Sequence, residues 1–576
     1  MQRSGIGLES RRPTLHGSRH AISAGHYLAA AAGFSVLEAG GNATDAGCAA
    51  GISLAVLCPF EVSAAGVAPI MIRSADGTVV TLAGLGPWPR SIRADVFMRE
   101  HGGTIPSGLL QTVVPAAPDA WITALRDFGT MTFGDVAGEA IRFAREGFAV
   151  YDLFAESVAS EASDYAQWET NAAIFLPNGR PPAVGDRFVQ ADLAATLQYM
   201  VDEERAASKG GRAAGLEAAR GAFYTGEIAD RIVRFHEAHG GHLTREDLAS
   251  FRTPREPAVR VRWRDFEVFT CGPWCQGPVL AQALTMLDSA GLTATAIDDP
   301  DYAHLVIEVL KAAFADREYR YGDPNFVDVR LDELLSAGHV AARLEAIDPA
   351  RAHPGLPPPL GADPSLVELL PEPAPSPLDA GRRDTSYVCV VDRWGNVFSA
   401  TPSDASSQSP VIPGTGFVPS SRGTQSRPDP RHPAAVGPGR RPRLTPNAAM
   451  AVRDDGSVLV FGCPGGDMQP QAMLQFFLNA FHFEMDVQDA INAPRVSTWS
   501  FPNSFAPFEY LPNHVAIEGR YDDHLFAELE RRGHDVERWP DFTRSAAAVE
   551  AIFRDASTGF LRAGADPRQP AYAIVA

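Results

Sequence analysis

Residues 384–396 read Asp384-Thr-Ser-Tyr-Val-Cys-Val-Val-Asp-Arg-Trp-Gly-Asn396, a run of strand-forming residues followed by turn residues. Residues 386–391 are rich in the β-branched and aromatic types that favour strands, and residues 392–396 contain the Asp, Gly and Asn of a turn. Residues 397–401, Val-Phe-Ser-Ala-Thr, restore the strand pattern. The stretch therefore predicts a β-hairpin, and the hydroxyl of Thr385 lies at its first step.

A second junction further along the chain combines a strand, a glycine turn and a helix. Residues 457–461 form a predicted strand, Gly462-Cys-Pro-Gly-Gly466 follows, and an apolar helix is predicted from about residue 468 to residue 481. Backbone N–H groups at the start of a helix have no partner within it, and the helix dipole favours negative charge there. Gly465 and Gly466 are thus placed where an anion can be received.

The sequence before the hairpin is mainly helical by its pattern of apolar residues. A strand-like segment is expected at residues 259–270. Residues 349–377 contain ten prolines and predict an irregular or mobile segment. The expected helices span residues 27–39, 44–57, 117–128, 133–146, 191–204, 228–239 and 303–319.

Composition excludes several classes of protein. The 576 residues are 45% hydrophobic, enough for a large core, and the net charge of −20 repels nucleic acid and anionic lipid. No apolar run is long enough to span a membrane, and residues 1–23 lack the apolar core of a secretory signal. We therefore expect a cytoplasmic protein without nucleic-acid or membrane partners. Six cysteines in so long a chain indicate free thiols.

Two motifs resemble metal or redox sites without meeting their requirements. His236, His239 and His242 are spaced three apart, which suits one helix face less well than a HExxH pair. Cys271 and Cys275 are separated by three residues instead of the two of a CxxC motif. Walker loops, GxSxG elbows and full GxGxxG fingerprints do not occur in the sequence. No metal and no cofactor is expected.

The segment around Thr385 resembles the start of the small subunit in the γ-glutamyltransferase family, in which the matching Thr becomes a new N-terminus by self-cleavage. The other similar segments follow the family's order, and the resemblance extends over residues 20 to 576. They lie at residues 33–46, 145–148, 241–248, 312–317, 322–324, 437–442, 462–466 and 492–495.

The resemblance implies an N-terminal-nucleophile hydrolase of the α/β (α+β) class, a four-layer αββα sandwich with two stacked sheets between helical layers. It implies cleavage between Asp384 and Thr385 into a large subunit, 1–384, and a small subunit, 385–576. The proline-rich segment 349–377 would then lie near the C-terminus of the large subunit. The two subunits would form a heterodimer, with a dimer of heterodimers as a further option.

The chemistry of Thr385 fits that placement. Its hydroxyl attacks a carbonyl, and the α-amine freed by cleavage, with an ordinary pKa of about 7.7 to 8.0, accepts the hydroxyl proton. The N–H groups of Gly465 and Gly466 would stabilise the oxyanion. Ser403, 18 residues after Thr385, matches a family hydroxyl that contacts the nucleophile, and Thr401 is the competing choice.

Departures from the family pattern concern the substrate. The Arg that holds the glutamate carboxylate in the transpeptidases aligns with Leu85, and the acid that meets the α-amine aligns with Gln425. The Ser-Ser pair of the transpeptidases becomes Leu444-Thr445. The Asn that lies two residues beyond the hydroxyl matched by Ser403 becomes Ala405.

Ser421-Arg-Gly423 is similar to the Asn-Arg-Gly of the acylase and oxamate-amidohydrolase members. Arg422 is a candidate anion fork, the alternative being a solvent-facing loop arginine. Asp467 and either Gln469 or Gln471 are also similar to those members. Two interpretations of these glutamines remain open: one of them faces the substrate pocket, or they lie on the surface of the helix.

The sequence therefore predicts an autoprocessed amidohydrolase that cleaves a small anionic amide or acyl-amide through an acyl-Thr385 intermediate. Its candidate substrate-binding residues are Arg422, Thr445, Asp467 and Gln469. One alternative is a γ-glutamyl hydrolase or transpeptidase acting on glutathione-like substrates. Another is a non-catalytic binding protein descended from the family. Water is favoured over an amine as the acceptor.

Overall fold

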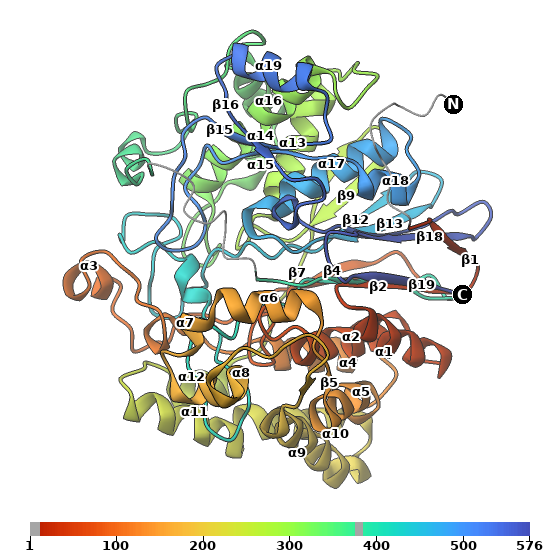
Figure 1. Cartoon of the computed structure of the whole chain (residues 1–576), viewed down its shortest axis with the longest axis vertical. Helices are drawn as coiled ribbons and strands as arrows, with labels where there is room; N and C mark the ends of the chain where they lie inside the picture. The colour runs from red at the N-terminus through yellow and green to blue at the C-terminus, as the bar shows by residue number, and fades with distance from the viewer. Residues whose placement is uncertain (1–11, 375–383) are drawn as a thin grey trace.

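The computed structural model describes residues 12–374 and 384–576 of the chain (Figure 1). The end of the proline-rich segment and the first eleven residues lie outside the described residues. Within the described part, residues 349–374 are mostly irregular, with a 3-10 helix at Pro364–Leu369, in agreement with the expected irregular segment.

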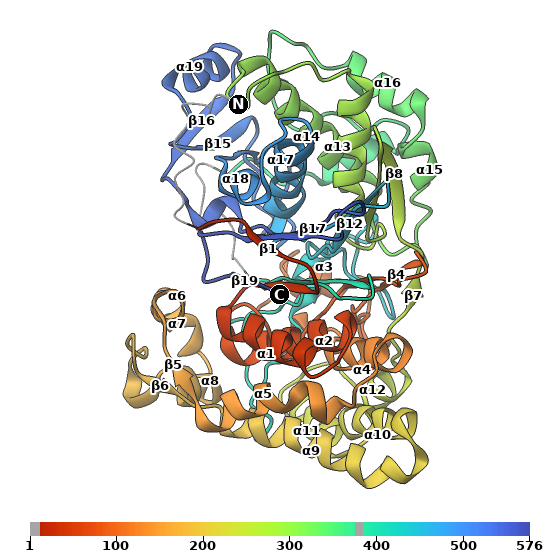
Figure 2. The ribbon, with the colours of Figure 1, turned by 90° about the vertical axis from the view of Figure 1, so that its right-hand side faces the viewer.

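Two seven-stranded antiparallel sheets lie face to face at the centre (Figure 2). The first sheet has the order β1-β18-β17-β13-β12-β9-β8, and the second the order β19-β2-β10-β11-β3-β4-β7. The first comprises β1 (Leu15–Gly17), β18 (Leu561–Ala565), β17 (Glu550–Arg554), β13 (Val458–Gly462), β12 (Ala449–Arg453), β9 (Phe266–Thr270) and β8 (Val259–Trp263). The second comprises β19 (Tyr572–Val575), β2 (Ala21–Ala24), β10 (Val388–Val391), β11 (Val397–Ala400), β3 (Ile70–Arg73), β4 (Val79–Leu82) and β7 (Arg255–Glu256).

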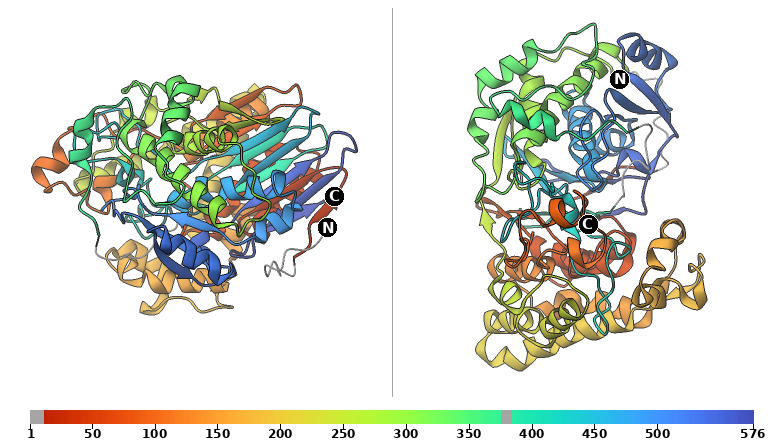
Figure 3. Two further views of the ribbon diagram at one scale, coloured as in Figure 1. Left: turned by 90° about the horizontal axis from the view of Figure 1, so that it is seen from above. Right: turned by 90° about the vertical axis from the view of Figure 1, so that its left-hand side faces the viewer.

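Helices cover the outer face of each sheet, so the predicted four-layer αββα sandwich is confirmed (Figures 2 and 3). The layer below the second sheet contains α1 (Tyr27–Glu38), α2 (Ala43–Leu57), α4 (Ala117–Phe128), α5 (Phe133–Glu146), α9 (Ala191–Ala207), α10 (Arg212–Tyr224) and α11 (Glu227–Ala238). The layer above the first contains α13 (Gly277–Ser289), α14 (Pro300–Arg320), α17 (Gln469–Phe481) and α18 (Val487–Asn492).

Shorter elements complete the fold. Among the described residues, no helix combines the length and the apolar character that crossing a bilayer requires. The shorter helices are α3 (Val96–Glu100), α6 (Asp152–Ser160), α7 (Ala162–Tyr165), α8 (Glu169–Phe175), α12 (Arg245–Ser250), α15 (Leu331–Leu334), α16 (Ala337–Glu345) and α19 (Asp523–Arg531). The remaining strands are β5 (Phe148–Ala149), β6 (Arg187–Phe188), β14 (Val496–Thr498), β15 (His514–Glu518) and β16 (Asp535–Trp539).

The predicted helices α1, α2, α4, α5, α9, α11, α14 and α17 are present with bounds that differ by at most a few residues. The single strand expected over residues 259–270 is wrong. It is a hairpin of β8 and β9, in which Trp263 pairs with Phe266. The chain reverses at Arg264, whose φ of 50° lies in the left-handed region. A short turn without Gly or Pro leaves little sequence signal.

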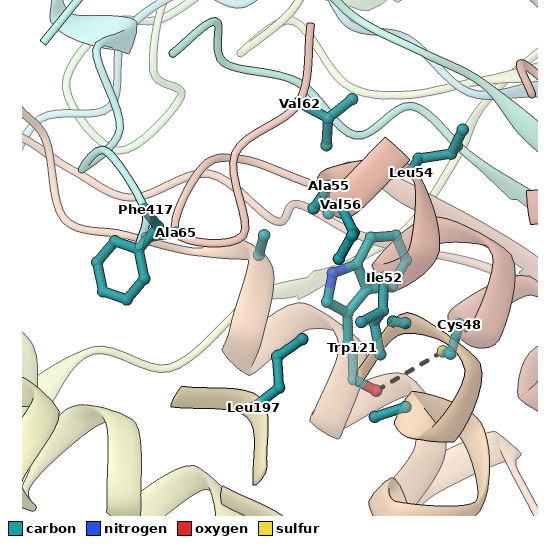
Figure 4. Close-up of a cluster of buried hydrophobic side chains, with 14 of the residues drawn as sticks. Cys48, Ile52, Leu54, Ala55, Val56, Val62, Ala65, Trp121, Leu197 and Phe417 are labelled. Carbon is teal, nitrogen blue, oxygen red and sulfur yellow. Dashed lines mark hydrogen bonds between the residues drawn. The ribbon is translucent and has the colours of Figure 1, made fainter. Parts of the chain in front are cut away.

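Helix α2 connects the turn of the β10–β11 hairpin to the apolar core. The Asn42 side chain accepts hydrogen bonds from the N–H groups of Thr44 and Asp45, completing a capping box. Asp392, in the hairpin turn, accepts from the Ala43 N–H at 2.9 Å. All residues of α2 are buried. Figure 4 shows Trp121 of α4 against this helix, with the Cys48 thiol 3.8 Å from the Trp121 carbonyl oxygen.

Gly47 permits close contact between α2 and the second sheet. A Cβ at this position would lie 2.1 Å from Cδ1 of Phe398 in β11. We expect Gly47→Ala to lower the free energy of unfolding by about 1–3 kcal/mol, because it overpacks the core. The matched variant Gly138→Ala, in α5, meets no atom within 4 Å and should stabilise by about 0.5–1 kcal/mol. Urea unfolding measures both; a stable Gly47→Ala protein would contradict the packing.

Candidate active site

The register of the β10–β11 hairpin places Thr385 opposite Ser403. Val388 pairs with Ala400, and the Ser386 N–H donates to the Pro402 carbonyl at 3.0 Å, continuing the same register. The hydroxyl oxygens of Thr385 and Ser403 lie 2.6 Å apart. Both residues are fully buried. The hairpin thus brings two of the predicted residues into direct hydrogen-bond contact.

Thr401, the competing hydroxyl, lies elsewhere. In the same register it falls opposite Tyr387 instead of Thr385. Its hydroxyl is buried and makes no hydrogen bond within the part of the chain that the structure describes. The hydroxyl that meets Thr385 is therefore that of Ser403.

The main chain at Thr385 is held in an unusual conformation. Its N–H donates to the Glu61 carbonyl at 3.0 Å, and its φ is 98°. A positive φ is costly for a β-branched residue, of the order of 1–3 kcal/mol. On the other side, the Ser403 N–H donates to the Val67 carbonyl at 3.0 Å. The two hydroxyls are thus fixed by backbone contacts with the segment before β3.

Arg422 reaches the same point from a 3-10 helix, Arg422–Gln425. It is fully buried, so it is not the solvent-facing arginine of the alternative interpretation. Its Nη2 donates to the carboxylate of Asp384 and to the hydroxyl of Ser403. Its Nε lies 3.3 Å from a carboxylate oxygen of Asp404. The residue before Thr385 is therefore held by a buried guanidinium.

Asp404 was not recognised as a site residue from the sequence, although it follows Ser403 directly. It accepts hydrogen bonds at 2.9 Å from the Ser420 hydroxyl, the Ser421 hydroxyl and the Ser421 N–H. Burial raises the pKa of Asp404, and Arg422 opposes that shift. Burial alone would lower the pKa of Arg422, but Asp384 and Asp404 outweigh it and raise that pKa. The three groups form one charge cluster.

Gly465 and Gly466 form the turn between β13 and α17, as predicted. Their φ values of 119° and 57° lie in the region that favours glycine. Within the described residues, neither N–H donates a hydrogen bond. Phe505 lies between this turn and Arg422. Its Cε2 is 3.5 Å from where a Gly466 Cβ would be, and its ring centroid is 5.5 Å from the Arg422 guanidinium carbon.

A polar network supports the glycine turn from behind. Asp467 pairs with Arg317 of α14 and accepts from the Ser504 N–H at 2.7 Å and hydroxyl at 2.6 Å. Arg317 donates to Gln276 at 3.0 Å, and Gln276 donates to the Gly466 carbonyl at 2.8 Å. Sequence reasoning missed Gln276 and Arg317, because their contacts arise only from the tertiary fold. The carboxylate of Asp467, a predicted substrate-binding residue, is therefore bonded to Arg317 and Ser504.

The other predicted substrate-binding residues are buried near this network. Thr445 accepts from the Gln425 side chain at 2.9 Å. The Gln469 side-chain oxygen Oε1 accepts from the Asn447 N–H at 3.1 Å, and the Gln469 Nε2 has no hydrogen-bond partner among the described residues. Gln471 accepts from the Thr498 N–H at 2.9 Å. Neither glutamine lies on the helix surface.

Among the described residues, the side chains of one group lie close enough together to bind a metal ion. The group consists of His304, Glu308 and His534. Its donors are already engaged. The Lys311 ammonium lies 2.8 Å from Glu308, and the imidazoles of His304 and His534 are hydrogen-bonded at 2.9 Å. A cation there would meet the positive charge of Lys311. The six cysteines are buried free thiols, as expected from the sequence.

Leu85, which aligns with the transpeptidase arginine, is also buried. It belongs to the apolar cluster between the sheets. It also lines a cavity of about 210 Å³ with Trp88, Asp247 and Arg441, and Thr385 is not among the lining residues. Leu85 therefore supplies no polar group to the site around Thr385.

Comparison with known proteins gives a consistent family. The Gamma-glutamyltranspeptidase family model matches residues 29–576. The Acylase ACY 1 proenzyme of a Pseudomonas species is 30% identical over 554 residues, 93% of this chain and 90% of that protein. The oxamate amidohydrolase proenzyme of Klebsiella pneumoniae is 28% identical over 563 residues, 96% and 97% of the two chains. The solved structure titled LmbA2991HD has a TM-score of 0.90 at 37% identity, covering 98% of this chain and all of that one. The chain therefore belongs to the gamma-glutamyltranspeptidase family and is an amidohydrolase of that family.

Proposed function

We propose that the chain cleaves itself between Asp384 and Thr385 and then hydrolyses a small anionic amide through an ester on Thr385. The contact that carries this proposal is the 2.6 Å separation of the Thr385 and Ser403 hydroxyls, with Arg422 bonded to Ser403 and to Asp384. Nucleophile, hydroxyl partner and cation thus meet at the peptide bond to be cut.

Processing begins with attack of Thr385 Oγ1 on the Asp384 carbonyl carbon. The C–O bond forms, the C–N bond breaks, and the hydroxyl proton passes through Ser403 to the leaving nitrogen. Water then hydrolyses the ester, leaving a carboxyl group on Asp384 and an amine on Thr385. The positive φ of Thr385 supports this step, because breaking the peptide bond releases the constrained backbone.

Turnover repeats both steps, acyl transfer to Thr385 and hydrolysis of the ester, on the amide bond of a substrate. The free Thr385 amine accepts the hydroxyl proton, and the hydroxyl attacks the substrate carbonyl. The unpaired N–H groups of Gly465 and Gly466 stabilise the oxyanion, supported by Asp467, Arg317 and Gln276 behind the turn. The amine product leaves, and water hydrolyses the acyl ester. Water is the proposed acceptor, and the products are a carboxylate and an amine.

γ-Glutamyl hydrolysis or transfer on glutathione-like substrates is the second candidate function, favoured by the name of the matching family. The buried apolar Leu85 argues against it, because a glutamate α-carboxylate needs a cation that this position lacks. The relatives are named as hydrolases, so a non-catalytic binding protein is not supported.

The cleaved pieces would remain one molecule. β2, from the first piece, lies between β19 and β10 of the second. Arg495 and Arg568 illustrate the small subunit's own buried charge network around Asp566. Processing thus divides the chain without dividing either sheet, as expected for a heterodimer of large and small subunits.

Thr385→Ala tests the nucleophile. We expect the natural chain to yield fragments 1–384 and 385–576, and the variant to stay at 61.7 kDa and to be inactive. Intact mass and N-terminal identification of the smaller fragment provide the measurement. Cleavage of the variant at the same bond would contradict the assignment of Thr385.

Ser403→Ala and Thr401→Ala form a matched pair of hydroxyl deletions on one strand extension. Loss of the Ser403 hydroxyl should slow processing on the order of 10²-fold, because proton transfer loses a positioned group. Thr401→Ala should process at the natural rate, because its hydroxyl makes no hydrogen bond with a described residue. Electrophoresis of timed samples gives both rates. Equal slowing would contradict the role proposed for Ser403.

Glu61, whose main-chain carbonyl accepts from the Thr385 N–H, predicts how the stability of the uncleaved chain depends on pH. Burial raises the pKa of Glu61 from 4.5 to about 7, against the opposing effect of Arg544. The folded chain therefore binds more protons than the unfolded chain between these values, and its stability falls as pH rises through this range. In the Thr385→Ala variant, we expect the free energy of unfolding to fall by about 2 kcal/mol between pH 5.5 and 7. The double variant Thr385→Ala/Glu61→Gln should not show this fall.

Urea unfolding at several pH values measures this difference. Glu368→Gln is a suitable control because its side chain is 72% exposed. Its stability curve should run parallel to that of the parent. Parallel curves for Glu61→Gln and the parent would contradict a proton held on Glu61.

A further inference from the structure

We propose that Asp384 fills the substrate's anion subsite in the uncleaved chain and thereby reveals its geometry. After processing, this subsite selects acyl groups whose carboxylate is separated from the reacting carbonyl by two carbon atoms, as in a succinyl group. The inference rests on the proposed function, because it requires that processing and turnover use the same Thr385 hydroxyl.

The two reactions share an intermediate. In processing, the Asp384 acyl group becomes esterified to Thr385 Oγ1, and in turnover the substrate acyl group becomes esterified to the same atom. The ester carbon is held in both cases by the same oxygen and the same oxyanion donors. Protein groups that surround the Asp384 side chain are therefore available to the acyl chain of a substrate.

Arg422 is the group that Asp384 meets. One Nη nitrogen donates to the Asp384 carboxylate, and the other is buried without a partner among the described residues. Asp404, fixed by Ser420 and Ser421, holds the Nε side of the same guanidinium. When Asp384 leaves, both Nη nitrogens of Arg422 become available to one carboxylate. That carboxylate can then bind through both of its oxygens, which is the bidentate geometry that arginine favours.

Charge balance also favours an anion in that place. Arg422 is fully buried and lies between two carboxylates in the uncleaved chain. Removal of Asp384 leaves Asp404 as its carboxylate partner among the described residues, together with the hydroxyl of Ser403. A buried guanidinium with unsatisfied N–H groups is costly, so binding a carboxylate recovers the lost interaction.

The covalent structure of Asp384 sets the length. Its Cα and Cβ separate the side-chain carboxyl carbon from the main-chain carbonyl carbon, which is the spacing in a succinyl group. An oxalyl group has no intervening carbon, a malonyl group has one, and a glutaryl or γ-glutamyl group has three. Each change moves the carboxylate by about 1 Å, a displacement that can cost on the order of 10²-fold in rate.

The rate test uses processed protein and five 4-nitroanilides: oxalyl, malonyl, succinyl, glutaryl and the uncharged butyryl. We expect the succinyl compound to have the highest kcat/KM, at least tenfold above the others. In processed Arg422→Gln, the advantage of succinyl over butyryl should disappear. Arg431→Gln, at an exposed arginine of the same region, should retain it. Equal rates for succinyl and butyryl, or a preference for another length, would overturn the inference.

A binding test is independent of catalysis and of processing. Calorimetry should show succinate binding to Asp384→Ala/Thr385→Ala, which cannot self-cleave, but not to Thr385→Ala, whose Asp384 fills the subsite. Oxalate and glutarate should bind the double variant at least tenfold more weakly. Equal succinate binding by both variants, or none by either, would overturn the inference even if the natural enzyme processes itself and hydrolyses amides. Failure of processing with selective succinate binding would instead overturn the proposed function alone.

Discussion

The antiparallel pairing of β10 with β11 is the interaction on which the site depends. A slip of one residue would turn every side chain of the hairpin to the opposite face and separate Thr385 from Ser403. Three contacts prevent such a slip. β2 pairs with β10 and β3 pairs with β11, so both edges of the hairpin are fixed. At the turn, Asp392 binds the first N–H group of α2. The helical layer thus helps to fix a register that is used at the other end of the hairpin.

Buried arginine–carboxylate pairs provide a second constraint on both sides of Thr385. Arg422 pairs with Asp384 and Asp404, and Arg317 pairs with Asp467 behind the glycine turn. Such pairs recover their desolvation cost only when their geometry is well satisfied, so each one limits where its neighbours can lie. They orient two functional elements, the loop that carries Arg422 and the turn that carries Gly465 and Gly466.

Local sequence patterns predicted much of this arrangement. The hairpin, the long helices and the strand–glycine–helix junction follow from short-range periodicity and turn residues, and the order of the motifs indicated the layered fold. The pattern was misleading at residues 259–270, where a turn at Arg264 carries no glycine or proline. Asp404 and Gln276 could not be found in this way, because their partners come from distant segments. The pairing of Arg422 with Asp384 could not be predicted from the sequence either, although Arg422 itself was singled out.

The proposed reaction requires one set of residues to hold a peptide bond first and a substrate later, and the two residues at that bond are anchored differently. Thr385 is retained by its position next to β10, its N–H contact with Glu61 and its hydroxyl contact with Ser403. The described hydrogen bonds of Asp384 involve its carboxylate alone, with Arg422 and with the Thr385 hydroxyl. Cutting the bond between the two residues would leave Thr385 anchored beside β10 and Asp384 held through its side chain. In the proposed reaction, a carboxylate that is held only through its side chain is exchangeable for the carboxylate of a substrate, and this asymmetry would turn the proposed cleavage site into a binding site.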